Sequence, residues 1–199
     1  MKYNKAHQFA ACGRRTPFSL RLRLHYKGAV VRWRYAPEVG SMRTRPNGHI
    51  WMAAEQFFNA AEHIWTDETV DLDRYVYPLV VNYAFSCELS LKASEGLVKF
   101  SEATPEGLLK AVNTESAVRG HDLHTIFIKL KPETQKAVET NFLASTGTQL
   151  IPLLKECSKY FAHGRYSFEQ IGGSYSLSGV RNLAKGLLDS VLAYGKGSA

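Results

Sequence analysis

The stretch over residues 79–91 constrains the fold most, because apolar side chains recur on nearly every face of the helix that it predicts. Pro78 stands where a first-turn proline is tolerated, so the helix is expected to open there and to run to about Phe100. A helix that is apolar on all sides belongs inside a bundle, not at its edge. The pattern therefore predicts a bundle built around this segment.

The other segments of the body are also typical of helices. Their apolar periodicity and end signals predict helices over residues 53–65, from Thr104, from Asp122 with a restart at residues 131–133 that continues to about Ala144, from Pro152 to Gly164 and over 177–194. No stretch of the body alternates persuasively with a period of two, and no internal repeat or glycine-rich phosphate loop is present. We therefore predict an all-α bundle of about five or six helices.

Charge divides the chain into two parts. Residues 1–51 hold 11 of the 25 Lys and Arg residues and a single acid, Glu38, whereas residues 52–199 are mildly acidic. The chain is long enough to bury one good core. We therefore predict a basic N-terminal extension over residues 1–51 and one helical domain over residues 52–199.

The basic extension alternates cationic and apolar residues around Gly28. It is expected to be either disordered or a short β-hairpin, and its cationic face could contact nucleic acid through Arg21, Arg23, Arg32 and Arg34. Three alternatives stay open, because an isolated hairpin is marginal in water, an Arg-rich amino end is typical of targeting segments, and Met52 resembles a natural start. In the last case residues 1–51 would be upstream sequence translated in error.

The cysteines and the hydropathy of the sequence argue against disulfide-rich, zinc-binding and membrane-spanning proteins. Cys12, Cys87 and Cys157 lie far apart and without paired spacing, so we expect neither a disulfide framework nor a zinc site. No metal and no cofactor is expected. No apolar run is long enough to span a membrane, and a reducing cytoplasm fits best.

Three charged motifs fall on segments that otherwise pack as helices. Glu88 and Lys92 are four residues apart on the central helix, Asp122 can cap the next helix beside His121, and Arg165 can bridge carboxylates. Charges in such positions need partners. We therefore predict one polar cluster that consists of Glu88, Lys92, His121, Asp122, Arg165, Tyr166 and Glu169.

The order of these motifs resembles the HEPN superfamily of small α-helical domains. The resemblance rests on the acid-x-x-x-Lys pair, on Gly-His-Asp-Leu at residues 120–123, and on Arg-Tyr-x-x-Glu at residues 165–169, and it covers residues 52–194. It implies a helical bundle that dimerises. Many such domains are ribonucleases of toxin–antitoxin and phage-defence systems, and others are non-catalytic modules that bind RNA or a partner protein.

The chain departs from the catalytic members of that superfamily. Those resemble one another in an Arg followed, after four to six residues, by a His in a late helix. No His follows Arg165, and Arg181 meets Gly186, Leu187 and Leu188 where the His would stand. The one match, Arg119 to His124, lies in another part of the fold and is of a kind that chance also produces.

These observations leave three functions open. We expect a non-catalytic or degenerate RNA-linked module in a defence or toxin–antitoxin context, a metal-independent endoribonuclease, or a purely structural dimeric interaction module. A ribonuclease site would draw on Arg119, His121, His124 and Arg165 for its base and its cation. The expected partners are a second copy of the chain, RNA and a protein such as a nucleotidyltransferase antitoxin. The stripe with Leu183, Leu187, Val191 and Tyr194 is either a dimer interface or ordinary core.

Overall fold

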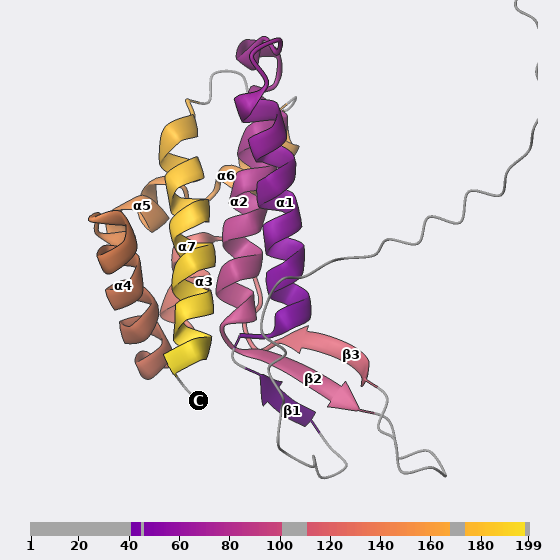
Figure 1. Ribbon diagram of the computed structural model, residues 1–199, viewed down its shortest axis with the longest axis vertical. Helices are drawn as coiled ribbons and strands as arrows, with labels where there is room; N and C mark the ends of the chain where they lie inside the picture. Colours follow the sequence, from indigo (N-terminus) through magenta and orange to yellow (C-terminus); the bar gives the residue numbers. More distant parts are fainter. Residues whose placement is uncertain (1–40, 45, 101–110, 168–173, 198–199) are drawn as a thin grey trace, which may run out of the picture. The chain divides into compact units, whose positions relative to one another are not determined.

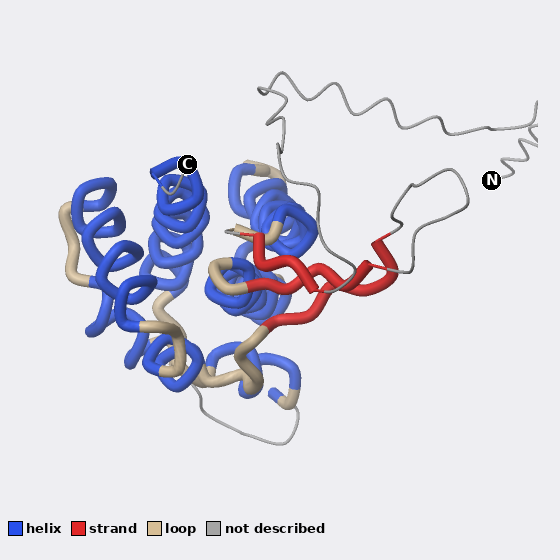
Figure 2. Tube along the Cα trace, turned by 90° about the horizontal axis from the view of Figure 1, so that it is seen from below, coloured by secondary structure: helices blue, strands red, loops and turns tan. Residues whose placement is uncertain are grey.

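The computed structural model of the chain describes residues 41–44, 46–100, 111–167 and 174–197. Within these ranges the chain forms a helical bundle, which confirms the predicted fold class of the body (Figure 1). A small antiparallel sheet adjoins the bundle (Figure 2). None of the described helices is both long and apolar enough to cross a membrane.

Helix α1 (Gly48–Thr66) begins before the predicted start at residue 53. Asn47 caps it, because its side-chain oxygen accepts hydrogen bonds from two backbone N–H groups of the first turn, at 3.1 and 3.2 Å. Met52 lies inside α1. The predicted boundary between residues 51 and 52 therefore falls within a continuous helix.

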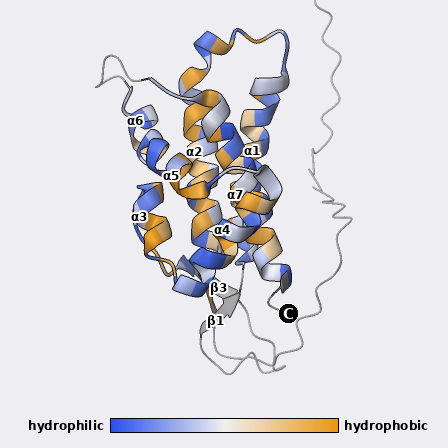
Figure 3. Cartoon of the chain, turned by 90° about the vertical axis from the view of Figure 1, so that its left-hand side faces the viewer, coloured by the Kyte–Doolittle hydropathy of each residue, from blue (hydrophilic) through white to orange (hydrophobic). Residues whose placement is uncertain are grey.

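Helix α2 (Val76–Ala93) is the central helix that the apolar segment predicts. It packs against α1, α6 (Tyr160–Arg165) and α7 (Leu177–Gly197), and Figure 3 shows hydrophobic residues gathered where the helices meet. Its fully buried apolar side chains face several directions and are Leu79, Val80, Tyr83, Ala84, Cys87, Leu91 and Ala93. Because α2 meets other elements on several sides, apolar residues on more than one face suit this position.

The sheet was not predicted. Its strands are antiparallel and lie in the order β1 (Ser41–Thr44), β2 (Gly96–Phe100), β3 (Ala111–Ser116). The predicted continuation of the central helix to Phe100 is wrong, since α2 ends at Ala93 and Gly96 opens β2. A Cβ atom at Gly96 would collide with the side chain of Asn47, so glycine allows β2 to pass close to the cap of α1. Strands this short carry too few residues for a clear period-two signal.

The remaining elements are the 3₁₀ turn η1 (Leu72–Arg74), α3 (Leu123–Ile128), α4 (Pro132–Thr146) and α5 (Leu150–Glu156). Helix α4 starts at Pro132 as predicted and is capped at its C-terminus by Gly147, whose φ of 69° is left-handed. The single helix expected between Pro152 and Gly164 is two helices, α5 and α6, separated at Cys157. Cys157 has no exposed surface, and burial raises the pKa of its thiol to about 12, so it packs as a small hydrophobic core residue.

The buried side chain of Glu95 connects the start of α4 to the rest of the bundle through hydrogen bonds. Its Oε1 atom accepts hydrogen bonds from the Lys131 backbone N–H at 2.7 Å and from the Thr134 hydroxyl at 2.8 Å. The Thr134 hydroxyl is also 3.1 Å from the hydroxyl of Tyr194 on α7. One carboxylate thus joins the end of α2 to α4, and through Thr134 to α7.

The apolar stripe of α7 belongs to the core. Leu183, Leu187 and Val191 have no exposed surface, and Tyr194 retains only 8%. Of the two predicted roles for this stripe, ordinary core packing is therefore the one the described residues support.

Several predicted features lie outside the described residues. These are the cationic face of the extension with Arg21, Arg23, Arg32 and Arg34, the short helix from Thr104, and Glu169 of the polar cluster.

Candidate functional site

One face of α2 carries the candidate site. Residues at spacings of three and four share a face of a helix, and this face bears Tyr77, Val81, Phe85, Glu88 and Lys92. Its first half is aromatic and apolar, and its second half is charged. The site therefore joins a ring surface to an ion pair on one rigid element.

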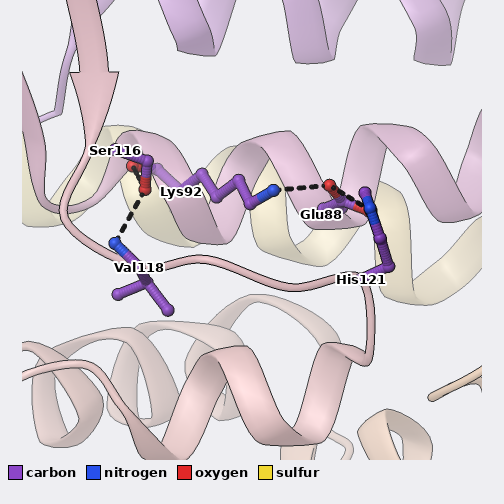
Figure 4. A network of polar contacts seen from close by, with 5 residues as sticks. All are labelled: Glu88, Lys92, Ser116, Val118 and His121. Atoms are coloured by element: carbon purple, nitrogen blue, oxygen red, sulfur yellow. Dashed lines mark hydrogen bonds and ion pairs between the residues drawn. The ribbon is translucent and has the colours of Figure 1, made fainter.

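Glu88 is the buried centre of the charged half. Its side chain is 2% exposed, and its Oε1 atom lies 2.6 Å from Lys92 Nζ. On its other side, His121 Nδ1 lies 3.1 Å from Oε2 and 3.2 Å from Oε1 (Figure 4). The buried carboxylate thus has the two partners that burial demands. The contacts of Glu88 with Lys92 and with His121 are among those that the sequence predicts.

His121 contacts Glu88 through one ring nitrogen, and more than half of its side chain is exposed. Its side chain is 59% exposed, although the carboxylate that holds it is buried. Because Nδ1 faces Glu88, Nε2 is left for a ligand, and the described residues offer it no hydrogen bond. A carboxylate that orients one ring nitrogen fixes the direction of the other.

Two features of the loop before α3 position this ring. Gly120 has a φ of 121°, a conformation that other residues rarely adopt. Asp122 caps α3 by accepting a hydrogen bond from the Thr125 backbone N–H at 2.7 Å, as the sequence predicts. His121 therefore stands between a glycine turn and a helix cap.

Ser116 ties the same loop to α2. Its hydroxyl donates to the backbone carbonyl of Lys92 at 3.4 Å and accepts from the Val118 backbone N–H at 3.2 Å (Figure 4). The end of β3 is thus anchored beside the ion pair. The sheet, which was not predicted, therefore positions the loop between β3 and α3, and with it His121, beside α2.

Phe161 connects His121 to Arg165. The Phe161 ring stacks on Phe85 of α2 with centroids 4.7 Å apart, and the His121 ring lies 5.6 Å from it. The Arg165 guanidinium lies over the same ring, with its Cζ atom 4.7 Å from the centroid. An exposed imidazole and an exposed guanidinium therefore flank one buried ring.

The structure differs here from the predicted polar network. Arg165 contacts the rings of Phe161 and Tyr166 and donates a hydrogen bond to the Tyr166 hydroxyl at 3.1 Å. Within the described ranges it forms no ion pair with Glu88. Its charge is not neutralised by that carboxylate and faces the surface.

Arg119 and His124 flank the site without joining its centre. Arg119 is exposed in the loop before α3, and His124 is half-buried in the first turn of α3. Neither is a hydrogen-bonding or ionic partner of Glu88 in the described part of the chain.

The positions where a late-helix histidine would stand are core positions. Gly186 is buried, and a Cβ atom there would collide with the Phe142 ring and lie 2.7 Å from Thr146 Cγ2 of α4. Leu187 has no exposed surface and Leu188 has 6%. Contact between α4 and α7 therefore occupies the space that an imidazole would need.

No family model, curated protein or solved structure matches this chain. The chemistry of the site therefore follows from its own residues.

A second charged cluster was not predicted from the sequence. Arg181 of α7 donates to both carboxylate oxygens of Glu62, at 2.7 and 2.8 Å, and the Tyr83 hydroxyl donates to Glu62 Oε1 at 2.6 Å. The Arg181 guanidinium also lies 5.3 Å from the Trp65 ring. Tyr83 gave a usable signal, because a phenol on a buried helix needs a hydrogen-bond partner. This cluster holds α1, α2 and α7 together, and the role of Arg181 in it is structural.

The Glu62 cluster predicts a pH effect on stability. The hydrogen bonds from Arg181 lower the pKa of Glu62 below its ordinary value of 4.5, against an opposing effect of burial. A lowered folded-state pKa means that the stabilisation is present above the ordinary value and is lost as pH falls through the lowered one. Glu62→Gln should therefore be less stable than the parent near neutral pH, and the difference should shrink between about pH 5 and pH 3. Urea titrations across that range would measure it, and a difference independent of pH would contradict the pairing.

A groove of about 310 Å³ lies on another part of the surface, between α4, α5 and α7. None of its lining residues belongs to the Glu88 and His121 cluster. Among the described residues, no group of three or more His, Cys, Asp or Glu side chains is placed to hold a metal ion.

Proposed function

We propose that this chain is a HEPN-like, RNA-linked domain of the degenerate type, which contacts RNA phosphates through His121 and Arg165. The helical bundle supports the proposal, and so do the places of the motifs at residues 88–92, 120–123 and 165–166 around α2. On this proposal the domain acts in the cytoplasm as a homodimer, in a defence or toxin–antitoxin context beside a partner such as a nucleotidyltransferase antitoxin.

The observation that carries the proposal is the exposure of His121. A network that served stability alone would be expected to bury its imidazole, yet this ring is 59% exposed while Glu88 beneath it is 2% exposed. The positive Arg165 stands over the neighbouring Phe161 ring. When the His121 ring is protonated, its Nδ1–H donates to Glu88 and its Nε2–H can donate to a phosphate oxygen, as can the Arg165 guanidinium beside it.

The residues of α7 favour a non-catalytic, degenerate domain over a catalytic one. Arg181 is held by both oxygens of Glu62, and Gly186 has no space for a side chain. Neither position can supply the groups that the catalytic members of the superfamily use.

A metal-independent endoribonuclease is the second candidate, favoured by the contact of Glu88 with His121 Nδ1. In that reaction the RNA 2′-oxygen attacks phosphorus while His121 Nε2 takes the 2′-hydroxyl proton. The bond from phosphorus to the 5′-oxygen breaks, and that oxygen takes a proton from water, which leaves a 2′,3′-cyclic phosphate and a 5′-hydroxyl. Arg165 would stabilise the charge on the phosphorane oxygens.

Binding of a labelled 20-nucleotide RNA to the full chain tests the proposal. His121→Ala and Arg165→Ala should each weaken binding by roughly tenfold, because each removes a hydrogen bond to a charged group. Arg165→Ala should also make the slope of log affinity against log salt less steep by about one unit. Fluorescence anisotropy at several salt concentrations measures both effects.

The controls separate this site from the basic extension and from general charge loss. His63→Ala and Arg74→Ala change exposed residues elsewhere and should leave the affinity unchanged. A variant with Arg21, Arg23, Arg32 and Arg34 all replaced by Ala reports the share of binding that belongs to the extension. If the parent binds no RNA, the structural interaction module is the better account. If the parent releases cyclic-phosphate products and His121→Ala does not, the ribonuclease is.

A further inference from the structure

The groove between α4, α5 and α7 has no part in the proposed function. It lies where the end of α4, helix α5 and the first half of α7 come together (Figure 1). Its volume of about 310 Å³ is at the lower end of the range for small-molecule sites. One water molecule takes up about 30 Å³ of the liquid, so the groove has room for a ligand of about ten non-hydrogen atoms.

Two glycines leave the backbone of α7 bare along the groove. Gly179 and Gly186 both line it, and their spacing of seven residues puts them on one face of the helix. Asn182 lies between them, and its exposed amide has no hydrogen-bond partner among the described residues. The α7 wall of the groove therefore offers an amide beside uncovered helix surface.

Lys185 and Asp189 add opposite charges to the same wall. They are four residues apart and exposed, and a base that precedes an acid by four is the less favourable order for pairing on a helix. Within the described ranges neither side chain forms an ion pair or a hydrogen bond. The pKa of Glu62 is lowered mainly by the hydrogen bonds from Arg181 and least by the more distant charge of Lys185. A cation and an anion are thus both open to a ligand.

The opposite wall supplies hydrogen-bond acceptors and apolar surface. The hydroxyls of Ser145 and Thr146 donate to the backbone carbonyl of Phe142, at 3.2 and 2.7 Å. The Thr146 oxygen also accepts from the Thr148 backbone N–H at 3.2 Å. Each hydroxyl oxygen keeps a lone pair for a ligand N–H. Phe142 and Leu153 line the apolar part.

We infer that this groove binds a free amino acid with an apolar side chain, such as leucine. The Lys185 ammonium binds its carboxylate, and the Asp189 carboxylate binds its ammonium group. A ligand with a single charge would pair with only one of these two residues. The apolar side chain lies against Phe142 and Leu153, and leucine is of the size that the groove holds. The site goes beyond the proposed function, because none of its lining residues belongs to the Glu88 and His121 cluster.

Titration of the isotope-labelled full chain with L-leucine tests the site by nuclear magnetic resonance. The backbone amide signals of Thr148 and Asn182 should shift, and that of His121 should not. N-acetyl-leucine lacks the ammonium group and leucinamide lacks the carboxylate. Each analogue should bind roughly tenfold more weakly than leucine, because it loses one hydrogen-bonded charge.

Variants of α7 assign each charge of the groove to one end of the ligand. Lys185→Met should weaken leucine binding roughly tenfold and leave leucinamide binding no weaker, because leucinamide has no carboxylate to lose. Asp189→Asn should weaken leucine binding to the same extent and leave N-acetyl-leucine binding no weaker. Lys136→Met and Glu139→Gln are the matched controls, since they remove exposed charges of α4 outside the groove. Both should bind leucine as the parent does.

Three results would overturn the inference. The first is a titration in which L-leucine leaves the groove signals unchanged, and the second is parental leucine affinity in both Lys185→Met and Asp189→Asn. The third is equal weakening of leucine and leucinamide by Lys185→Met, because the lysine would then not hold the carboxylate. RNA binding by the parent and its loss in His121→Ala report separately on the proposed function, since neither measurement changes a groove residue.

Discussion

Replacing Glu88 with Ala is expected to lower the free energy of unfolding by about 3 kcal/mol. The side chain is 2% exposed and holds Lys92 at 2.6 Å, while Lys92 itself is only 17% exposed. Removing the carboxylate leaves a largely buried ammonium group without its counter-charge, and it also frees His121. Urea denaturation followed by circular dichroism measures the change.

Two further variants separate charge from packing at this position. Glu88→Gln keeps the shape of the side chain and removes its charge, so it should also be destabilised clearly. Glu139→Ala replaces an exposed acid in the interior of α4 and should change stability by no more than about 0.5 kcal/mol. A Glu88→Ala variant as stable as Glu139→Ala would contradict the buried position of the ion pair.

Gly186→His is expected to cost at least about 3 kcal/mol, because the new side chain has no space beside Phe142 and Thr146. This substitution restores the Arg-x4-His spacing from Arg181. It should nevertheless yield no ribonuclease activity, because Arg181 remains bonded to Glu62. Thermal unfolding and an RNA cleavage assay measure the two expectations.

Lys185→His is the matched control, since it places the same imidazole one residue earlier on an exposed position of α7. Its stability should stay within about 0.5 kcal/mol of the parent. Combining Gly186→His with Phe142→Ala should recover part of the loss, because the smaller residue vacates the space. If Gly186→His melts at the parental temperature, the described contact between α4 and α7 is wrong.

Local patterns in the sequence predicted the helices well. The apolar residues on all sides of α2, the Asp122 cap and Pro132 at the start of α4 each act within a few residues of chain. The sheet escaped prediction because β1 pairs with β2 across more than fifty residues. No local signal reports such pairing when the strands have four to six residues.

The same difference between local signals and long-range contacts applies to the candidate site. The Glu88 and Lys92 pair could be predicted because a spacing of four fixes their proximity on a helix. The pairing of Glu62 with Arg181 joins residues 119 positions apart and depends on how α1 and α7 pack. Arg165 was expected to seek a carboxylate, but α6 ends beside Phe161 and Tyr166, and the guanidinium lies on their rings.

Nuclear magnetic resonance of the His121 imidazole tests the central claim most directly. With histidines labelled in the ring, titration of the full chain with single-stranded RNA should shift the His121 resonances, assigned by their loss in His121→Ala. The resonances of His63 should not move. RNA binding that leaves the His121 signals unchanged would contradict the claim that this imidazole, oriented by Glu88, contacts RNA.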